Sequence, residues 1–232
     1  MALKKGLLFV LSALVLLLAG ISIYINLERQ PVKVRIINLS NEWLTLQARI
    51  DDWELPYTIS YGTSSEYITV DNRRTAIDLI VITLDSHELA FNNIPLAPDS
   101  LNTLVLYSAN PDHYYRLNTP ASVPRNRTAL RFIPDPLVQR DIQLSQINEE
   151  IQHNFSSTEE EQGEYKLLTE DYYNLKIIED GKETQFRVFL EKGEYYTLVI
   201  ISSVDSYEPK PRLFVDNLPG DQYVIPTSKT IR

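Results

Sequence analysis

The chain has 232 residues, of which 44% are hydrophobic and 23% are charged, and its net charge at neutral pH is −9. Because it contains no cysteine, disulfides, thiolate metal sites, iron–sulfur clusters and cysteine nucleophiles are excluded. The acidic balance argues against nucleic acid as a partner, since phosphates are neutralised by clustered lysine and arginine.

The N-terminal segment is apolar. Residues 6–25 carry no charge and follow Lys4 and Lys5. As a helix rising about 1.5 Å per residue, this stretch would span a hydrocarbon layer of about 30 Å. We therefore predict a signal anchor or signal peptide over residues 1–29, with the lysines in the cytoplasm and the rest of the chain exported. An uncleaved anchor is favoured, because Leu17 and Leu18 stand where cleavage needs small side chains.

The exported part is more acidic than the whole chain. Removing Lys4, Lys5, Arg29 and Glu28 from the 22 basic and 31 acidic residues leaves a net charge of −11. This charge keeps an exported domain soluble, and it argues against tight binding of an anionic surface or polymer.

Short β-strands are predicted after the anchor. Alternating or continuously apolar stretches stand at residues 32–37, 44–50, 66–70, 76–84, 88–94 and 101–108. Turn-forming compositions separate them. The stretch 76–84 is nearly all apolar, which is typical of a strand covered on both faces. Strands of this number and spacing indicate a β-sandwich.

The second half of the chain repeats the first. The stretch TLVLYS at residues 103–108 returns as TLVIIS at 197–202. Three further matches keep the same order and nearly the same spacing: VRII with LRFI (34 and 130), EY with EY (66 and 164), and DLIV with NLKI (78 and 174). The repeat predicts two copies of one β-domain.

The predicted fold class is all-β, with two tandem immunoglobulin-like β-sandwich domains behind one N-terminal helix. The domains are expected over residues 30–120 and 121–217, and a C-terminal tail over 218–232. Residues 109–127 read either as an interdomain linker or, in part, as an edge strand on the first copy.

The three residue types of a serine hydrolase triad occur together at Asp85–His87, but they do not predict catalysis. Adjacent strand residues point to opposite faces and cannot converge, and the repeat aligns this stretch with the hairpin dipeptide Asp180–Gly181. No nucleophile elbow of a serine hydrolase is present. We expect no catalytic site and no enzyme activity.

No metal or cofactor is predicted either. His87, His113 and His153 fall in or beside loops, far apart in the sequence. The acidic run Glu159–Glu161 with Glu164 lacks the ligand spacing of a calcium loop, so a solvated loop is favoured.

Exposed aromatic rings would suit carbohydrate. The candidates are Trp43, Trp53, Tyr114, Tyr115, and the pair Tyr172 and Tyr173. Packing in the core or between domains is favoured for most of them. Tyr114 and Tyr115, in the proline-rich connection, are the pair that we expect to be exposed and available for binding.

Several stretches resemble a family of bacterial exported β-sandwich proteins. The stretches are VRIINLS, YGTSSEY, IDLIV and LNTLVLYS, and the matching positions are Val34, Arg35, Asn38, Tyr61, Gly62, Ser65 and Tyr67. Two such units behind an export segment are similar to the AlgF-type accessory proteins of alginate and exopolysaccharide O-acetylation. The second copy departs from the pattern, since Pro134 stands at the asparagine position.

The resemblance implies a non-catalytic accessory protein in the periplasm or on the extracytoplasmic face of the inner membrane. Its implied partners are a membrane acyltransferase and periplasmic acetyltransferase proteins, with polysaccharide as a further ligand. The family supplies no catalytic residues. The alternative reading is a cell-surface adhesion or carbohydrate-binding module.

Overall fold

The computed structural model describes residues 32–40, 45–70, 74–98, 100–107, 114–120, 127–134, 140–147, 151–155, 163–202, 209–216 and 222–223. Regular structure in these ranges is all β-strand. None of the described residues forms a helix long and apolar enough to span a membrane. The predicted anchor at residues 6–25 and the acidic run at 159–161 lie outside the described residues.

The strands follow one another along the whole described chain. The first nine are β1 (Val32–Asn38), β2 (Thr45–Ile50), β3 (Trp53–Ser60), β4 (Thr63–Ser64), β5 (Ile68–Val70), β6 (Ala76–Thr83), β7 (Glu88–Pro95), β8 (Ser100–Leu106) and β9 (Tyr114–Pro120). The others are β10 (Thr128–Ile133), β11 (Asp141–Gln146), β12 (Gln152–Phe155), β13 (Lys166–Leu168), β14 (Asp171–Glu179), β15 (Lys182–Leu190), β16 (Tyr195–Ser202), β17 (Pro209–Val215) and β18 (Gln222–Tyr223).

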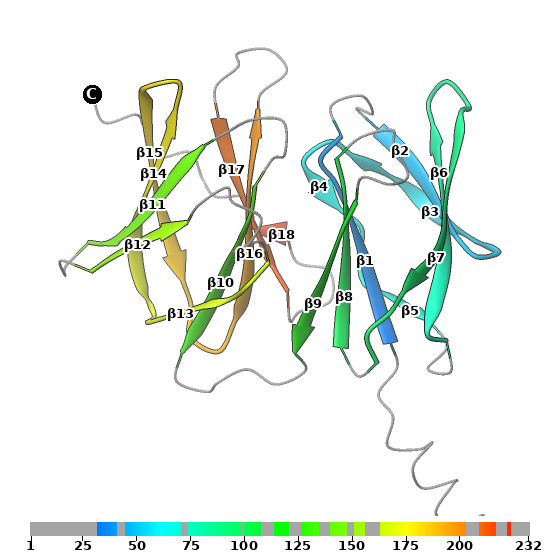
Figure 1. Ribbon diagram of the computed structural model, residues 1–232, viewed down its shortest axis with the longest axis horizontal. Helices are drawn as coiled ribbons and strands as arrows, with labels where there is room; N and C mark the ends of the chain where they lie inside the picture. Colours follow the sequence, from blue (N-terminus) through cyan, green and yellow to red (C-terminus); the bar gives the residue numbers. More distant parts are fainter. Residues whose placement is uncertain are drawn as a thin grey trace, which may run out of the picture.

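Within the described residues, the strands form four sheets. Strands β1 to β9 make unit one, with an inner sheet β4-β1-β8-β9, to which β5 is added beside β1, and an outer sheet β3-β2-β6-β7. Strands β10 to β18 make unit two, with an inner sheet β13-β10-β16-β17-β18 and an outer sheet β12-β11-β14-β15. The sheets lie as successive layers, and the two inner sheets face each other in the middle (Figure 1).

The inner sheets are buried on both faces. In β1, Ile36 packs into the core shared with the outer sheet, whereas its neighbour Ile37 packs against unit two. In β16, Leu198 and Val199 alternate between the same two environments. A strand covered on both sides needs consecutive apolar residues. This need explains why TLVLYS and TLVIIS both carry four consecutive apolar residues.

The prediction that residues 76–84 form a strand covered on both faces is wrong. This stretch is β6, which buries Ile77 and Leu79 on one face only. On the other face, Asp78 is exposed and Ile80 is only partly buried. The strand belongs to an outer sheet, and no other sheet of the described residues covers its second face.

The repeat in the sequence is also a repeat in the structure. In unit one, β1 pairs in parallel with β8, and Arg35 lies opposite Thr103. In unit two, β10 pairs in parallel with β16, and Arg131 lies opposite Thr197. These are the residues that the sequence repeat matches with one another.

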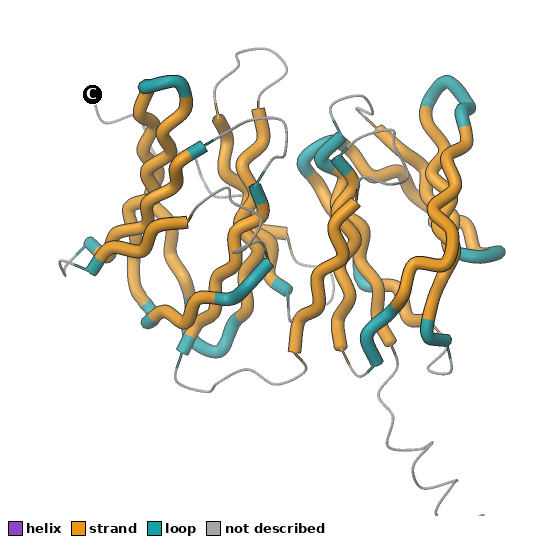
Figure 2. Tube along the Cα trace, in the orientation of Figure 1, coloured by secondary structure: helices purple, strands orange, loops and turns teal. Residues whose placement is uncertain are grey.

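Both predicted hairpin turns are present. Asp85–His87 lies in the turn between β6 and β7. In the turn between β14 and β15, Asp180 and Gly181 have φ angles of 50° and 74°, as a two-residue hairpin turn requires. Figure 2 shows both turns as loops at the far ends of the outer sheets.

The connection between the copies is partly an edge strand. Residues 114–120 form β9, which pairs with β8 along seven positions. The tail also contributes a short strand, since β18 pairs with β17 at Gln222 and Tyr223.

Candidate functional site

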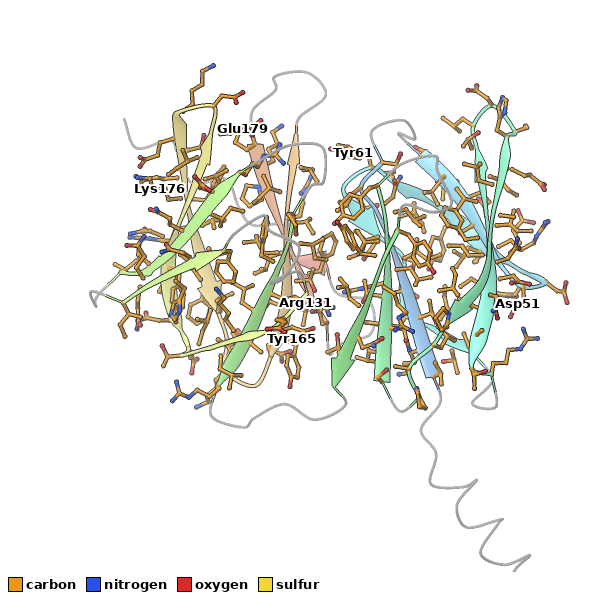
Figure 3. The ribbon with its side chains drawn as sticks, viewed as in Figure 1. Asp51, Tyr61, Arg131, Tyr165, Lys176 and Glu179 are labelled. Atoms are coloured by element: carbon orange, nitrogen blue, oxygen red, sulfur yellow. The ribbon has the colours of Figure 1, made fainter. Side chains whose placement is uncertain are left out.

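A groove of about 760 Å³ opens on unit one. It lies between β3, an edge strand of the outer sheet, and β5, which borders the inner sheet. Its lining residues are 50–53, 56–57, 66–70 and 74. Figure 3 marks its position by Asp51, which belongs to the turn between β2 and β3.

A β-bulge shapes the strand beside the groove. One residue of β2 separates Gln47 from Arg49. Their partners on β3, Thr58 and Glu54, are separated by three residues. The two extra residues interrupt the alternation of side chains within the bulge and re-aim those that it contains. Pro56 lies in the bulge and has no N–H group for a further strand.

The bulge turns the ring of Tyr57 outward, and Trp53, at the start of the same strand, is exposed beside it. Leu55 and Ile59 are each only 1% exposed and point into the core. Trp53 and Tyr57 are 51% and 37% exposed, and both line the groove. In a regular strand Tyr57 would share the buried face of Leu55 and Ile59. The bulge therefore adds Tyr57 to Trp53 in an aromatic surface that lines a concave site.

Polar contacts fix the two ends of this surface. Asp51 forms an ion pair with Arg74, and its Oδ1 accepts a hydrogen bond from the backbone N–H of Asp78 at 3.0 Å. The phenol oxygen of Tyr57 accepts a hydrogen bond from the backbone N–H of Glu66 at 3.1 Å. Partial burial raises the pKa of Tyr57, and its O–H is a donor that a ligand can use.

A buried ionic cluster joins the two units. We define the arginine–aspartate cluster as Arg35 of β1, Arg131 of β10 and Asp216 at the end of β17, with Tyr67 and Tyr165 around them. The three charged residues are 3%, 0% and 0% exposed. Figure 3 shows Arg131 and Tyr165 close together in the lower part of unit two.

Asp216 is the centre of this cluster. One carboxylate oxygen bonds the guanidinium of Arg35. The other accepts hydrogen bonds from the hydroxyls of Tyr165 at 2.7 Å and Thr197 at 2.5 Å, and lies 3.3 Å from the guanidinium of Arg131. A buried carboxylate needs this saturation of its lone pairs to remain charged.

The two arginines are related by an approximate twofold symmetry. Arg35 donates to the backbone carbonyl of Val215 at 3.0 Å, and Arg131 donates to that of Asn118 at 3.2 Å. The next residue on each strand is Asp216 in unit two and Thr119 in unit one. Arg131 reaches the Thr119 hydroxyl at 3.3 Å, as Arg35 reaches Asp216. The interface thus resembles that of an isologous dimer.

The charges do not follow the twofold symmetry, since the guanidiniums of Arg35 and Arg131 share the single carboxylate of Asp216. Aromatic rings add favourable contacts to both arginines. The guanidinium of Arg35 lies 4.9 Å from the ring centre of Tyr67 and 5.7 Å from that of Phe214. That of Arg131 lies 4.6 Å from Tyr165. Each such contact contributes on the order of 1–2 kcal/mol when desolvated.

Tyr67 connects the cluster to the groove. Its ring lines the groove and supports Arg35, and its hydroxyl donates to the backbone carbonyl of Asp216 at 2.7 Å. Burial raises the pKa of Tyr67, although the charge of Arg35 opposes this effect. The groove and the interface of the two units therefore share one side chain.

The residues that carry the family resemblance serve the fold. The side chain of Asn38 donates to the backbone carbonyl of Ile59 at 3.2 Å, and Ser65 Oγ accepts from the backbone N–H of Ile36 at 2.9 Å. Gly62 has a φ of +71°, and a Cβ there would lie 2.6 Å from the side chain of Ile201 in unit two. The motif holds β1 and its neighbours together and lets unit two approach closely.

The expected exposure of Tyr114 and Tyr115 is corrected by the structure. Both side chains are partly buried. Tyr114 packs edge-on against Phe91, at a ring distance of 5.9 Å, and Tyr115 packs against Tyr107, at 4.9 Å. Because β9 is a paired strand and not a free linker, its aromatic side chains are held against the cores on either side.

The other singled-out residues do not come together in a site. His87 is exposed in its hairpin turn and His153 is partly buried on β12, while His113 lies outside the described residues. Burial, with a smaller effect of Lys166, lowers the pKa of His153. No group of three potential metal ligands occurs in the part of the chain that the structure describes.

The sequence contained a signal for the groove that is clear only in hindsight. The stretch WELPY carries a proline inside an otherwise alternating strand, which is typical of an edge strand or a bulge. No such signal in the sequence marks Asp216. The residue at the equivalent position of unit one is Thr119, and the side chains that contact Asp216 are distant from it in the sequence.

Comparisons with known proteins give only remote likenesses. No protein-family model matches the chain, and no curated protein matches it. Solved structures that match include three that are each described as a putative cell adhesion protein. That of Bacteroides ovatus has 10% identity, covers 83% of this chain and 99% of its own, and gives a TM-score of 0.26. Those of Bacteroides uniformis (10% identity, 82% and 98% covered, TM-score 0.22) and Bacteroides fragilis (11%, 83% and 100%, 0.25) are similar. At these scores the likeness carries no argument about the role of this chain.

Proposed function

We propose that this protein is a non-catalytic carbohydrate-binding protein and that the groove of unit one is its binding site. The observation that carries the proposal is the pair of exposed aromatic rings, Trp53 and Tyr57, in a concave site of about 760 Å³. Ligand sites combine concavity and aromatic surface with a few placed polar groups.

The chemistry of the groove suits a pyranose chain. The C–H groups of a sugar ring form an apolar face that can stack on Trp53 or Tyr57. Its hydroxyls need donors and acceptors at the rim, which the hydroxyl of Tyr57 and the carboxylate of Asp52 can supply. The bulge and Pro56 disfavour an added peptide strand on β3, so we favour a glycan over a protein strand there.

Two of the polar groups that line the groove, those of Asp51 and Tyr57, are occupied by structural contacts, and this supports a non-catalytic role. Asp51 is held by Arg74 and by a backbone N–H, and the Tyr57 oxygen is held by another backbone N–H. These contacts position a ligand surface and leave no evident general-base role for Asp51.

A titration of the full-length chain in mild detergent against a panel of oligosaccharides tests the proposal. Trp53→Ala should weaken binding at least about ten-fold, equivalent to about 1.4 kcal/mol, since the stacking surface is lost. Tyr172→Ala is the matched control, because Tyr172 is also 51% exposed but lies on the outer sheet of unit two. Unchanged affinity in Trp53→Ala, or an equal loss in the control, would contradict the proposal.

An accessory role in polysaccharide O-acetylation is a second proposal. Its support is the family resemblance of the stretches around Val34 and Tyr61. In that role the protein would be exported and anchored by residues 6–25 on the extracytoplasmic face of the inner membrane, and would contact a membrane acyltransferase and periplasmic acetyltransferase proteins. Affinity purification in mild detergent should recover the membrane acyltransferase or a periplasmic acetyltransferase. Recovery of neither class of enzyme would argue against the role.

A further inference from the structure

We infer that the ligand of the groove is a cationic, amine-bearing glycan, such as a chain of amino sugars with free ammonium groups. The inference rests on the proposed function and specifies its ligand class. It is argued from the charges that line the groove and from their position beside the aromatic rings.

The lining is negatively charged. It holds three carboxylates, from Asp51, Asp52 and Glu66, and one guanidinium, from Arg74. Arg74 is already neutralised by its ion pair with Asp51. The remaining two carboxylates have no ion-pair partner among the described residues. The groove therefore presents two uncompensated negative charges to a ligand.

These carboxylates stand beside the aromatic surface. Asp52 immediately precedes Trp53 in the chain. Glu66 bonds Tyr57 through its backbone N–H, and the charge of Glu66 adds to the effect of burial in raising the pKa of that phenol. A ring face and a carboxylate together recognise an ammonium group, through cation–π attraction and a charge-assisted hydrogen bond.

The same charges disfavour the opposite class of ligand. A polyuronate carries a carboxylate on each sugar and would meet Asp52 and Glu66 at short range. The net charge of −9 on the whole chain adds long-range repulsion. An accessory role toward an anionic polymer such as alginate would then depend on protein contacts and not on this groove.

The test is calorimetric titration of the full-length chain in mild detergent with three β-1,4-linked hexamers: glucosamine, N-acetylglucosamine and mannuronate. We expect the glucosamine hexamer to bind about ten-fold more tightly than the N-acetylated one, and mannuronate to bind most weakly. Raising the salt concentration to about 0.5 M should reduce this preference, because exposed charges are screened.

Charge variants assign the preference to the groove. The double variant Asp52→Asn with Glu66→Gln should lose about ten-fold in affinity for the glucosamine hexamer and little for the N-acetylated one. Glu54→Gln is the matched control, an exposed acid on β3 that does not line the groove, and it should change neither affinity.

The outcomes separate the two proposals. Binding of none of the three hexamers would overturn this inference, whereas the proposed function would be overturned only if no oligosaccharide of the wider panel bound in a Trp53-dependent way. Binding that depends on Trp53 but favours the N-acetylated or the mannuronate hexamer would leave the function intact and overturn the ligand class. A double variant that keeps the preference for glucosamine would also overturn it.

Discussion

At the scale of single residues, the carboxylate of Asp216 is the group that holds the arginine–aspartate cluster together. It is fully buried and joins Arg35 of unit one to Arg131 of unit two. Burial lowers the pKa of Arg35, but the charge of Asp216, its hydrogen bond and the nearby phenols of Tyr67 and Tyr165 together raise it overall. Removing one member of a buried ionic cluster is costly, because the others keep the cost of desolvation and lose their partner.

The variant Asp216→Asn should therefore lower the free energy of unfolding by about 3–5 kcal/mol, as seen in urea denaturation. The matched control is Glu183→Gln, which removes the exposed ion pair between Glu183 and Lys176 and should leave the urea midpoint unchanged. Similar midpoints for both variants would mean that Asp216 does not hold the units together.

A second prediction at this scale concerns alkaline pH. Burial raises the pKa of Tyr165, and the charge of Asp216 raises it further. In the unfolded chain the phenol has its usual pKa near 10. Its contribution to stability is thus fully present below about pH 10 and is lost as the pH rises toward the folded-state pKa, because only the unfolded chain releases the proton.

Urea denaturation at a series of pH values above about 10 checks this prediction. The unmodified chain should lose stability with rising pH more steeply than Tyr165→Phe, which lacks the ionisable group. Tyr165→Phe should be less stable at pH 7, since Asp216 loses a hydrogen bond of 2.7 Å. Parallel pH profiles would show that the buried phenol is not the source of the slope.

At the scale of elements, the four sheets differ in what covers them. The inner strands β1, β8, β10 and β16 have a layer on each side, and the outer strands have one. Ile37 of β1 is 0% exposed because unit two covers it, whereas Ile80 of β6 is only partly buried. The same residue type should therefore contribute differently in the two strands.

We expect Ile37→Ala to lower the free energy of unfolding by about 2–5 kcal/mol, the usual range for a large truncation in a core. Ile80→Ala should cost about 1 kcal/mol or less, as at a partly exposed site. Both values come from urea denaturation of the full chain. Equal costs would contradict the close packing of the two inner sheets against each other.

At the scale of the whole molecule, periodicity predicted the all-β fold well. Alternation and turn compositions are local signals, so the strands and the hairpins at Asp85 and Asp180 could be located from the sequence. The repeat was visible because the two copies bury the same inner strands and so need the same apolar stretches. The immunoglobulin-like topology and the domain limits at residues 120 and 217 stay predictions.

The site was not predictable by the same means. The outward position of Tyr57 depends on a bulge whose register is fixed by pairing with β2. Tyr114 and Tyr115 are partly buried because β9 packs Tyr114 against the core of unit one and Tyr115 against the cluster shared with unit two, which is a tertiary effect. The prediction for residues 76–84 was wrong because hydrophobicity alone does not distinguish a strand covered on both faces from a strand covered on one face.

Hydrogen–deuterium exchange of the full chain with and without saturating glucosamine hexamer tests the location of the binding site most directly. The account predicts slower exchange at residues 50–57 and 66–70, which border the groove, and no change at the exposed aromatic pair Tyr172 and Phe189 on unit two. Protection confined to unit two, or absent from the groove while the ligand is bound, would contradict it.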